Sequence, residues 1–199
     1  RVHSQVSDEP ITSESAMSFY IECLQENIKD YDYMIRPYDD GKRMLHIAFN
    51  MPNENSTLNS VLQSSSDAYL KSTMEYLSTL KSPVLLRIGG EMNVWTNLAD
   101  PQAFKDAYIK IANMARNIAP NVALVFSPND ISNWNTDIQR YYPGDAYVDW
   151  VGVSLYTNKY QDANSPKANE DFSEMFYGNG AYSNPIAKLK EIVTLYGDK

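Results

Sequence analysis

An apolar run that breaks off in glycines and polar residues constrains the fold of this chain most. The five residues Val84–Ile88 are too few for a buried helix and follow Pro83, so they predict a strand that is covered on both faces. Gly89 and Gly90 then allow unusual backbone dihedrals or a close approach of the backbone where this strand ends. In parallel α/β sheets ligands bind at the carboxyl ends of strands. The acid that follows, Glu91, is therefore placed where such a fold carries out chemistry.

Strand-like and helix-like segments alternate along the rest of the chain. Short apolar stretches between turns predict strands, and apolar residues three or four positions apart predict amphipathic helices. Asp100 is a suitable cap for one of these helices, and Pro101 suits its first position. This order indicates βαβ units around a parallel sheet. The predicted strands are Leu45–Asn50, Val122–Ser127 and Val148–Tyr156, and the predicted helices are Ala68–Leu80, Pro101–Ala119 and Ile186–Tyr196.

The first forty residues have a different pattern. Apolar residues at helical spacing predict a helix over Ser15–Ile28, and Tyr33–Asp40 is predicted to be a short strand. The single cysteine, Cys23, is expected to pack in or near the core. We find no linker or repeat that divides the chain, so residues 1–199 are predicted to form one domain, with residues 1–40 as its N-terminal part.

Composition excludes several classes of function. The net charge is −8 and no run of basic residues occurs, which argues against nucleic-acid binding. No stretch reaches the roughly 20 apolar residues that cross a bilayer. The sequence has no cluster of His and Cys, no spaced Asp loop, no Gly-rich phosphate loop and no Gly-x-Ser-x-Gly motif. We therefore expect neither a metal nor another cofactor.

Three motifs carry a resemblance to a known family. They are Arg87 to Trp95, Val122 to Asn129, and Tyr141 to Val153 with its run Tyr-Pro-Gly-Asp-Ala-Tyr-Val-Asp-Trp-Val-Gly. These motifs resemble consecutive strand regions of glycoside hydrolase family 26, which contains β-mannanases and some related β-glucanases and xylanases. The resemblance extends from about residue 45 to residue 156. It implies a (β/α)8 TIM barrel and retaining hydrolysis of a β-linked polysaccharide such as β-mannan, β-glucan or xylan.

The resemblance also implies roles for individual residues. Glu91 matches the general acid/base at the end of the fourth strand of the barrel, and Trp95 matches a sugar platform beside it. A tyrosine at the end of the sixth strand commonly supports the nucleophile in such barrels, which assigns that role to Tyr156. The predicted substrate-binding residues are Arg87, Asn93, Trp95, Asn129, Trp134 and Tyr156.

The chemistry of glycoside cleavage explains the need for Glu91. The leaving oxygen requires a proton, and a carboxyl group supplies it near neutral pH when desolvation or a second carboxylate raises the pKa of that carboxyl. A glutamate at the end of an apolar strand meets this need. Retention also requires a second carboxylate about 5 Å away as the nucleophile.

The family places this nucleophile on the strand after the sixth helix, which Ile186–Tyr196 resembles. The nucleophile is therefore expected beyond Lys199. A chain of 199 residues is also shorter than the roughly 250 of a complete barrel. We expect an incomplete barrel, from strand two or three to helix six, with the missing barrel segments in the rest of the polypeptide. Because polysaccharides do not enter cells, this activity implies an extracellular or cell-surface location.

Several alternatives remain open from the sequence. Many family members have His directly before the acid/base, whereas this chain has Gly90, which indicates a different sugar preference. Arg87 is either functional or a buried ion-pair partner, and His46 lies either at the barrel mouth or in the core. Trp150 is expected to pack in the core. The alternative function is a non-catalytic carbohydrate-binding or cell-surface protein, which would need no glutamate on a strand soon after Asp198.

Overall fold

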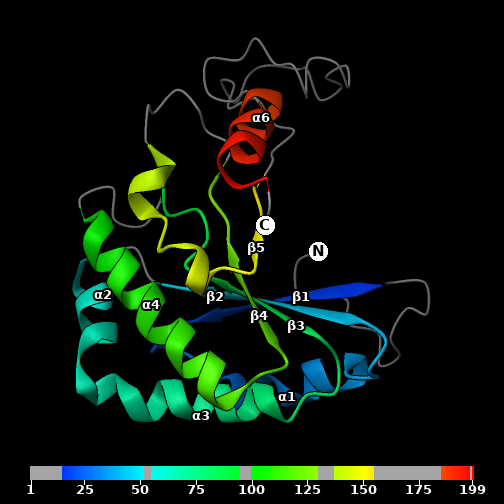
Figure 1. Cartoon of the computed structure of the whole chain (residues 1–199). Helices are drawn as coiled ribbons and strands as arrows, with labels where there is room; N and C mark the ends of the chain where they lie inside the picture. Colours follow the sequence, from blue (N-terminus) through cyan, green and yellow to red (C-terminus); the bar gives the residue numbers. More distant parts are fainter. Residues whose placement is uncertain (1–14, 52–54, 95–99, 130–136, 155–184, 198) are drawn as a thin grey trace, which may run out of the picture.

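The computed structural model describes residues 15–51, 55–94, 100–129, 137–154, 185–197 and 199 (Figure 1). The strands are β1 (Ala16–Glu22), β2 (Met44–Asn50), β3 (Val84–Ile88), β4 (Val122–Phe126) and β5 (Trp150–Val151). The α-helices are α1 (Asp32–Ile35), α2 (Asn55–Leu62), α3 (Asp67–Ser78), α4 (Pro101–Ile118) and α6 (Pro185–Tyr196). Short 3-10 helices cover Ile28–Tyr31, Arg36–Tyr38, Ser64–Ser66, Ile138–Tyr141 and Asp145–Tyr147.

The five strands form one parallel sheet in the order β1-β2-β3-β4-β5. Its registers place Tyr20, Ala48, Arg87, Val125 and Trp150 in one row across the sheet. Neighbouring residues in such a row point to the same face. All five carboxyl ends therefore meet along one edge, which we call the carboxyl rim.

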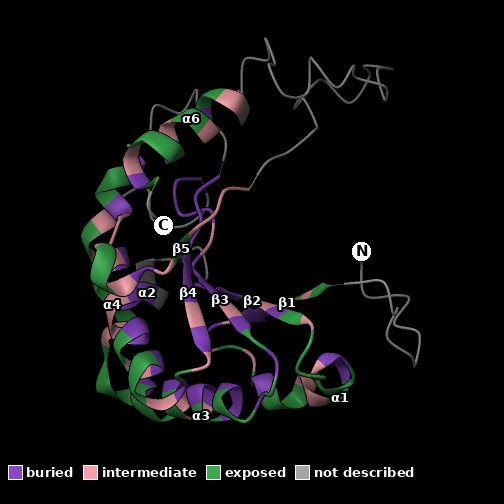
Figure 2. Ribbon diagram, turned by 45° about the vertical axis from the view of Figure 1, so that its right-hand side comes forward, coloured by how far each residue is buried: buried purple, intermediate pink, exposed green. Residues whose placement is uncertain are grey.

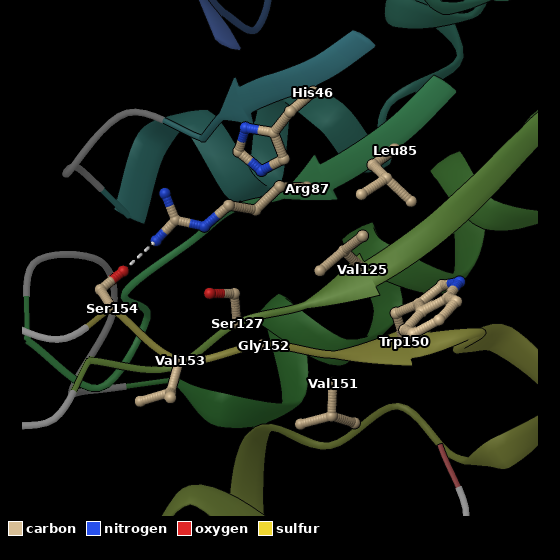
Figure 3. Close-up of a pocket in the computed structure, with 10 residues that line it drawn as sticks. All are labelled: His46, Leu85, Arg87, Val125, Ser127, Trp150, Val151, Gly152, Val153 and Ser154. Carbon is tan, nitrogen blue, oxygen red and sulfur yellow. Dashed lines mark hydrogen bonds between the residues drawn. The ribbon is translucent and has the colours of Figure 1, made fainter. Parts of the chain in front are cut away.

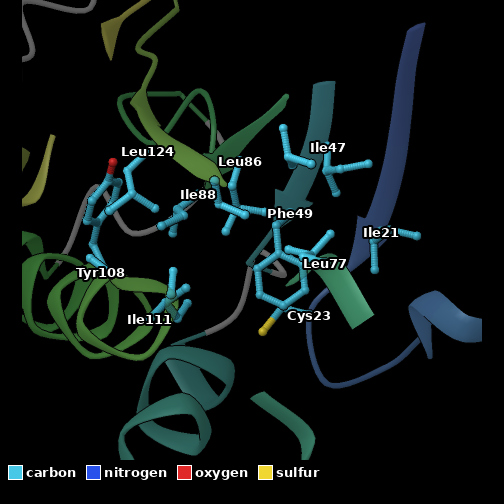
Figure 4. Close-up of a cluster of buried hydrophobic side chains, with 14 of the residues drawn as sticks. Ile21, Cys23, Ile47, Phe49, Leu77, Leu86, Ile88, Tyr108, Ile111 and Leu124 are labelled. Carbon is cyan, nitrogen blue, oxygen red and sulfur yellow. The ribbon is translucent and has the colours of Figure 1, made fainter. Parts of the chain in front are cut away.

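The two faces of the sheet differ. Figure 2 shows α1, α3, α4 and α6 in an arc on one side of the strands. The strand residues on that side, such as Leu86 and Ile88 of β3, are buried against the helices. Leu85 of the same strand lies on the opposite face and is only partly buried, so the helices cover one face of β3 and not both. This core includes Ile21, Cys23, Ile47, Phe49, Leu86, Ile88 and Leu124 from the strand side, with Leu77, Tyr108 and Ile111 from the helices (Figure 4).

The opposite face carries Ser18, Tyr20, His46, Arg87 and Trp150, and we call it the open face. Tyr20 and Trp150 are 56% and 55% exposed there. Helices on the outside of a parallel sheet, with the other face turned inward, match an incomplete (β/α)8 barrel. The predicted fold class is confirmed. No helix in the described ranges is both long and apolar enough to span a membrane.

The predictions between β2 and α4 agree closely with the structure. β3 has the predicted bounds, and α4 begins at Pro101 as predicted. The Asp100 Oδ1 atom accepts a hydrogen bond from the Ala103 backbone N–H at 2.9 Å, which is the expected N-cap. α2 was not predicted from the sequence.

The prediction of a helix over Ser15–Ile28 is wrong, because this segment contains β1. Its apolar residues fit a helical period, but Phe19 and Ile21 also alternate as a strand requires, and pairing with β2 selects the strand. The predicted strand at Tyr33–Asp40 is also wrong, since it is mainly helical turns. Cys23 is fully buried as expected, and burial raises the pKa of its thiol to about 12.

The prediction that Trp150 packs in the core is wrong. Alternation with Val148 suggested a shared buried face, and Val148 is indeed buried. Val148, however, directly follows the 3-10 helix Asp145–Tyr147 and precedes β5, so strand alternation does not extend through it. Trp150 therefore lies on the open face.

Asp149 joins β5 to the rest of the sheet and gives a testable pH dependence. Its carboxylate accepts hydrogen bonds from Arg116 Nη2 at 2.6 Å and from the Leu124 backbone N–H at 2.7 Å. Desolvation raises the pKa of Asp149, but these two bonds outweigh it, and the pKa lies below the ordinary value of 3.8. A lowered pKa stabilises the folded state above the pKa of the unfolded chain, and this stability is lost as pH falls through the folded pKa.

We expect Asp149→Asn to lower the free energy of unfolding by about 1–2 kcal/mol at neutral pH, where charge-assisted bonds are lost. The difference from wild type should shrink as the pH falls below the ordinary pKa of 3.8, because the unfolded wild-type chain then takes up a proton more readily than the folded carboxylate, whose pKa is lowered. Urea denaturation at a series of pH values measures both effects. Asp30→Asn, at an exposed position, is the matched control. A difference that stays constant with pH would contradict the assignment.

Candidate functional site

Glu91 has an unusual backbone at the carboxyl rim. Its φ is +61°, in the left-handed region that residues other than glycine rarely adopt. The residue is only 8% exposed, and its backbone N–H donates to the Ser127 carbonyl at 2.8 Å. Its own carbonyl accepts from the Val94 N–H at 2.9 Å. Such strained residues cluster at functional sites, because surrounding structure must hold them in place.

Arg87 reaches from β3 toward Glu91. Its guanidinium donates a hydrogen bond from Nη2 to the Ser154 Oγ at 2.7 Å, and the same Nη2 lies 3.7 Å from the Glu91 Oε1. Both side chains are about nine-tenths buried. A buried cation without partners is costly, so Ser154 and Glu91 explain how this arginine is accommodated in an apolar strand. The structure thus brings two of the predicted site residues together.

Asn93 and Asn129 are both predicted substrate-binding residues, and they bond to each other. The Asn93 Nδ2 donates to the Asn129 carbonyl at 3.0 Å, and the Asn129 N–H donates to the Asn93 Oδ1 at 2.7 Å. Each residue is only 1% exposed. The Asn93 side-chain amide therefore makes the same pair of hydrogen bonds to the Asn129 backbone that a neighbouring strand would make. These bonds connect the loop after β3 to the loop after β4. This geometry gives Asn93 a role in holding the rim together.

A pocket of about 340 Å³ lies on the open face below these loops (Figure 3). His46 stands over one side of it, with its Nδ1 2.8 Å from the Ser18 Oγ. Burial lowers the pKa of His46, and the charge of Arg87 lowers it further, so its neutral form is favoured. Glu91 does not line this pocket, but Arg87 connects the two. The lining residues are His46, Leu85, Arg87, Val125, Ser127, Trp150, Val151, Gly152, Val153 and Ser154.

Other predicted site residues lie outside the part of the chain that the structure describes. These are Trp95, Trp134 and Tyr156. Their roles remain predictions from the resemblance.

Several residues at the rim were missed from the sequence. Ser127 ends the predicted strand Val122–Ser127, and Ser154 lies within Val148–Tyr156, so strand ends alone would have suggested both. Glu22 and Asn50 also end β1 and β2, and the Asn50 Nδ2 donates to the Glu22 Oε1 at 2.9 Å. Glu22 was missed because its segment was predicted to be a helix. Among the described residues, no group of three His, Cys, Asp or Glu is placed to hold a metal ion.

The chain is similar in sequence to known proteins. The model of Glycosyl hydrolase family 26 matches residues 45–185. A beta-1,3-xylanase from Alcaligenes sp. is 28% identical over 128 residues, which cover 58% of this chain and 25% of that protein. The chain therefore spans about a quarter of the length of this curated relative.

One solved structure supports a similar fold. The structure of a GH26 beta-mannanase from Bacteroides ovatus superposes with a TM-score of 0.51 at 19% identity, over 70% of this chain and 51% of that one. The structure of GH26C from Muricauda sp. has a TM-score of 0.47 at 17% identity, over 65% and 43% of the two chains. At such identity the mannanase supports the barrel fold alone.

Proposed function

Because the chain belongs to glycosyl hydrolase family 26, we propose that it hydrolyses a β-linked polysaccharide with retention, using Glu91 as general acid and then general base. The observation that carries this proposal is the state of Glu91 itself. A carboxyl group that is about nine-tenths buried, on a left-handed backbone, stands at the carboxyl rim of a parallel sheet. This is where a barrel enzyme places its reacting groups.

The reaction proceeds in two steps under this proposal. In the first, the Glu91 carboxylic acid donates its proton to the glycosidic oxygen as the bond from that oxygen to the anomeric carbon breaks. A second carboxylate attacks the anomeric carbon and forms a glycosyl ester with the enzyme. In the second step, Glu91 removes a proton from water, the water oxygen bonds to the anomeric carbon, and the ester bond breaks. Glu91 is then protonated again.

The second carboxylate is proposed to come from the strand that follows α6 in the family's barrel, beyond Lys199. In this proposal residues 1–199 form part of one barrel domain, and the remaining strands cover the open face. The exposed side chains of Tyr20, Met44 and Trp150 support that part of the proposal, because they give the open face an apolar surface that further strands would bury. Trp95, Trp134 and Tyr156 are proposed to contact the sugar chain.

The substrate class follows the relatives in general terms. One is named a beta-1,3-xylanase and another a beta-mannanase, so a β-linked polysaccharide is common to both. Neutral sugars need no metal or organic cofactor for this chemistry, since two carboxyl groups suffice. A substrate of this kind also implies a protein that acts outside the cell or at its surface.

Hydrolysis of a substrate panel tests the proposal. The full-length protein should release reducing ends from at least one of β-1,4-mannan, β-1,3-xylan and mixed-linkage β-glucan. Proton NMR of the first product should show the β anomer, because the mechanism retains configuration. Binding without release of reducing ends would contradict hydrolysis and favour a carbohydrate-binding protein. An initial α anomer would contradict retention.

A further inference from the structure

The guanidinium of Arg87 lies across the backbone of Gly90. A Cβ atom added at Gly90 would come within 2.3 Å of the Arg87 Cζ, 2.4 Å of its Nε and 2.5 Å of its Nη2. Real Cβ atoms do not approach other atoms so closely. The planar end of Arg87 therefore occupies the volume that any side chain at position 90 would need.

The backbone gives no other reason for glycine at this position. Gly90 is not among the residues with positive φ, unlike Gly89, whose φ is +55°. A Cβ at Gly90 has its closest contacts with one side chain, that of Arg87. The need for glycine at position 90 thus comes from where the arginine lies.

Arg87 also keeps an unused hydrogen-bond donor in this place. Its Nη2 bonds to Ser154, but its buried Nε has no hydrogen-bond partner among the residues that the structure describes. Buried donors are nearly always paired, and an unpaired one costs roughly 1–3 kcal/mol. Arg87 lines the pocket on the open face and lies beside the Glu91 carboxylate, so its guanidinium group is close to a ligand bound there (Figure 3).

We propose that Arg87 is the polar group that contacts the sugar unit bound next to Glu91, and that Gly90 is required to leave it that space. This inference rests on the proposed function, because it needs a glycan at Glu91. Under this proposal Arg87 and Gly90 together determine the sugar preference, because Arg87 can contact the sugar only where position 90 has no side chain. Hydroxyl oxygens of a pyranose are the acceptors that a guanidinium would bind.

A double-mutant cycle in the full-length protein tests the link. Gly90→Ala and Arg87→Ala should each lower kcat/KM on the best substrate of the panel by about 100-fold, because displacing a group at the site by an ångström has an effect of that size. The double variant should be no worse than Arg87→Ala alone, since the new methyl group then fits. Arg36→Ala, an arginine that bonds to Thr79 away from the rim, should instead combine additively with Gly90→Ala.

A second variant separates sugar contact from packing. Arg87→Met keeps much of the side-chain length and removes every donor. It should weaken binding of a β-1,4-manno- or β-1,3-xylo-oligosaccharide at least about ten-fold by isothermal titration calorimetry, as expected for a lost hydrogen bond from a charged group. Its preference between the two oligosaccharides should also change. If Arg87 had only a structural role, Arg87→Met would lower the melting temperature and leave both the affinity and the preference unchanged.

The outcomes distinguish this inference from the proposed function. Additive effects in the cycle, or unchanged affinity and preference in Arg87→Met, would overturn the inference while hydrolysis by the wild type still stood. Binding without hydrolysis by the wild type would overturn the proposed hydrolysis, and the cycle measured on affinity would still decide the role of Arg87. A wild type that neither binds nor hydrolyses any glycan of the panel would overturn both. If Gly90→Ala does not fold, its rescue by Arg87→Ala remains the expected result, and failure of the double variant to fold would overturn the link.

Discussion

Replacing Glu91 with glutamine should lower kcat/KM on the natural glycan by about 1000-fold, within the range that a positioned general acid contributes. Glutamine has almost the same shape and keeps the buried position, but it has no acidic proton to give to the leaving oxygen. The affinity for an oligosaccharide should change little, because the substitution does not remove a bulky contact. Release of reducing ends and isothermal titration calorimetry on the full-length protein measure the two quantities.

A change of leaving group tests whether Glu91 acts as an acid. An aryl glycoside whose phenol is strongly acidic needs little protonation, so the first step of Glu91→Gln should be much less impaired with that substrate than with the polysaccharide. Glu75→Gln is the matched control, since Glu75 is an exposed glutamate on α3. Turnover of the polysaccharide by Glu91→Gln within a few-fold of wild type would show that Glu91 is not the general acid.

Replacing Gly89 with alanine should destabilise the protein by about 3 kcal/mol, because it combines backbone strain with overpacking. The φ of Gly89 is +55°. A Cβ there would also come within 2.4 Å of the Met51 Cε and 2.8 Å of the Phe104 Cε2. Phe104 is a fully buried residue of α4, so it has little room to move. Urea denaturation gives the change in the free energy of unfolding.

Gly41→Ala provides the matched control for this prediction. Gly41 has a φ of +75°, but a Cβ there would meet Lys81 only at 4.0 Å, so strain acts without a clash. We expect a destabilisation of about 1–2 kcal/mol, as for a left-handed residue that gains a Cβ. Equal losses of stability in the two variants would show that contact with Met51 and Phe104 does not contribute.

The two predictions concern one loop. Gly89 allows the backbone to turn directly after β3 while it stays packed against the core. Glu91 follows two residues later and also has a positive φ. The bond from the Glu91 N–H to Ser127 and the paired amides of Asn93 and Asn129 hold this loop to the end of β4. Strain at an acid is tolerable when neighbouring bonds determine its position in this way.

Much of the fold was predictable because local patterns agree with the tertiary structure. β3 is apolar at every position except Arg87, and α4 has a cap, a proline at its start and one apolar face. For such segments the pattern, the capping residues and the final packing all favour the same element. The position of Glu91 was also predictable, because an acid that follows a buried strand lies at the rim where ligands bind in such folds.

The failures have different causes. β1 satisfied both a helical and a strand period, and only its pairing with β2 decided between them. Because this segment was predicted to be a helix, Glu22 at the end of β1 was not predicted as a site residue. Trp150 was misplaced because the 3-10 helix before β5 interrupts the alternation that the sequence suggested. For β1 the pairing with a strand distant in the sequence set the outcome, and for Trp150 a change in the local backbone did.

By itself, therefore, the sequence determined where β3, β4, α3, α4 and α6 form, that the sheet is parallel, and that Glu91 stands at its rim, because these depend on local periodicity and on the order of elements. Only the tertiary structure decided that Asn93 pairs with a backbone, and that Arg87 fills the space over Gly90. The physical reason is that side chains of neighbouring strands and loops compete for the same volume and the same hydrogen-bond partners. That competition has no signature in the spacing of residues along one strand.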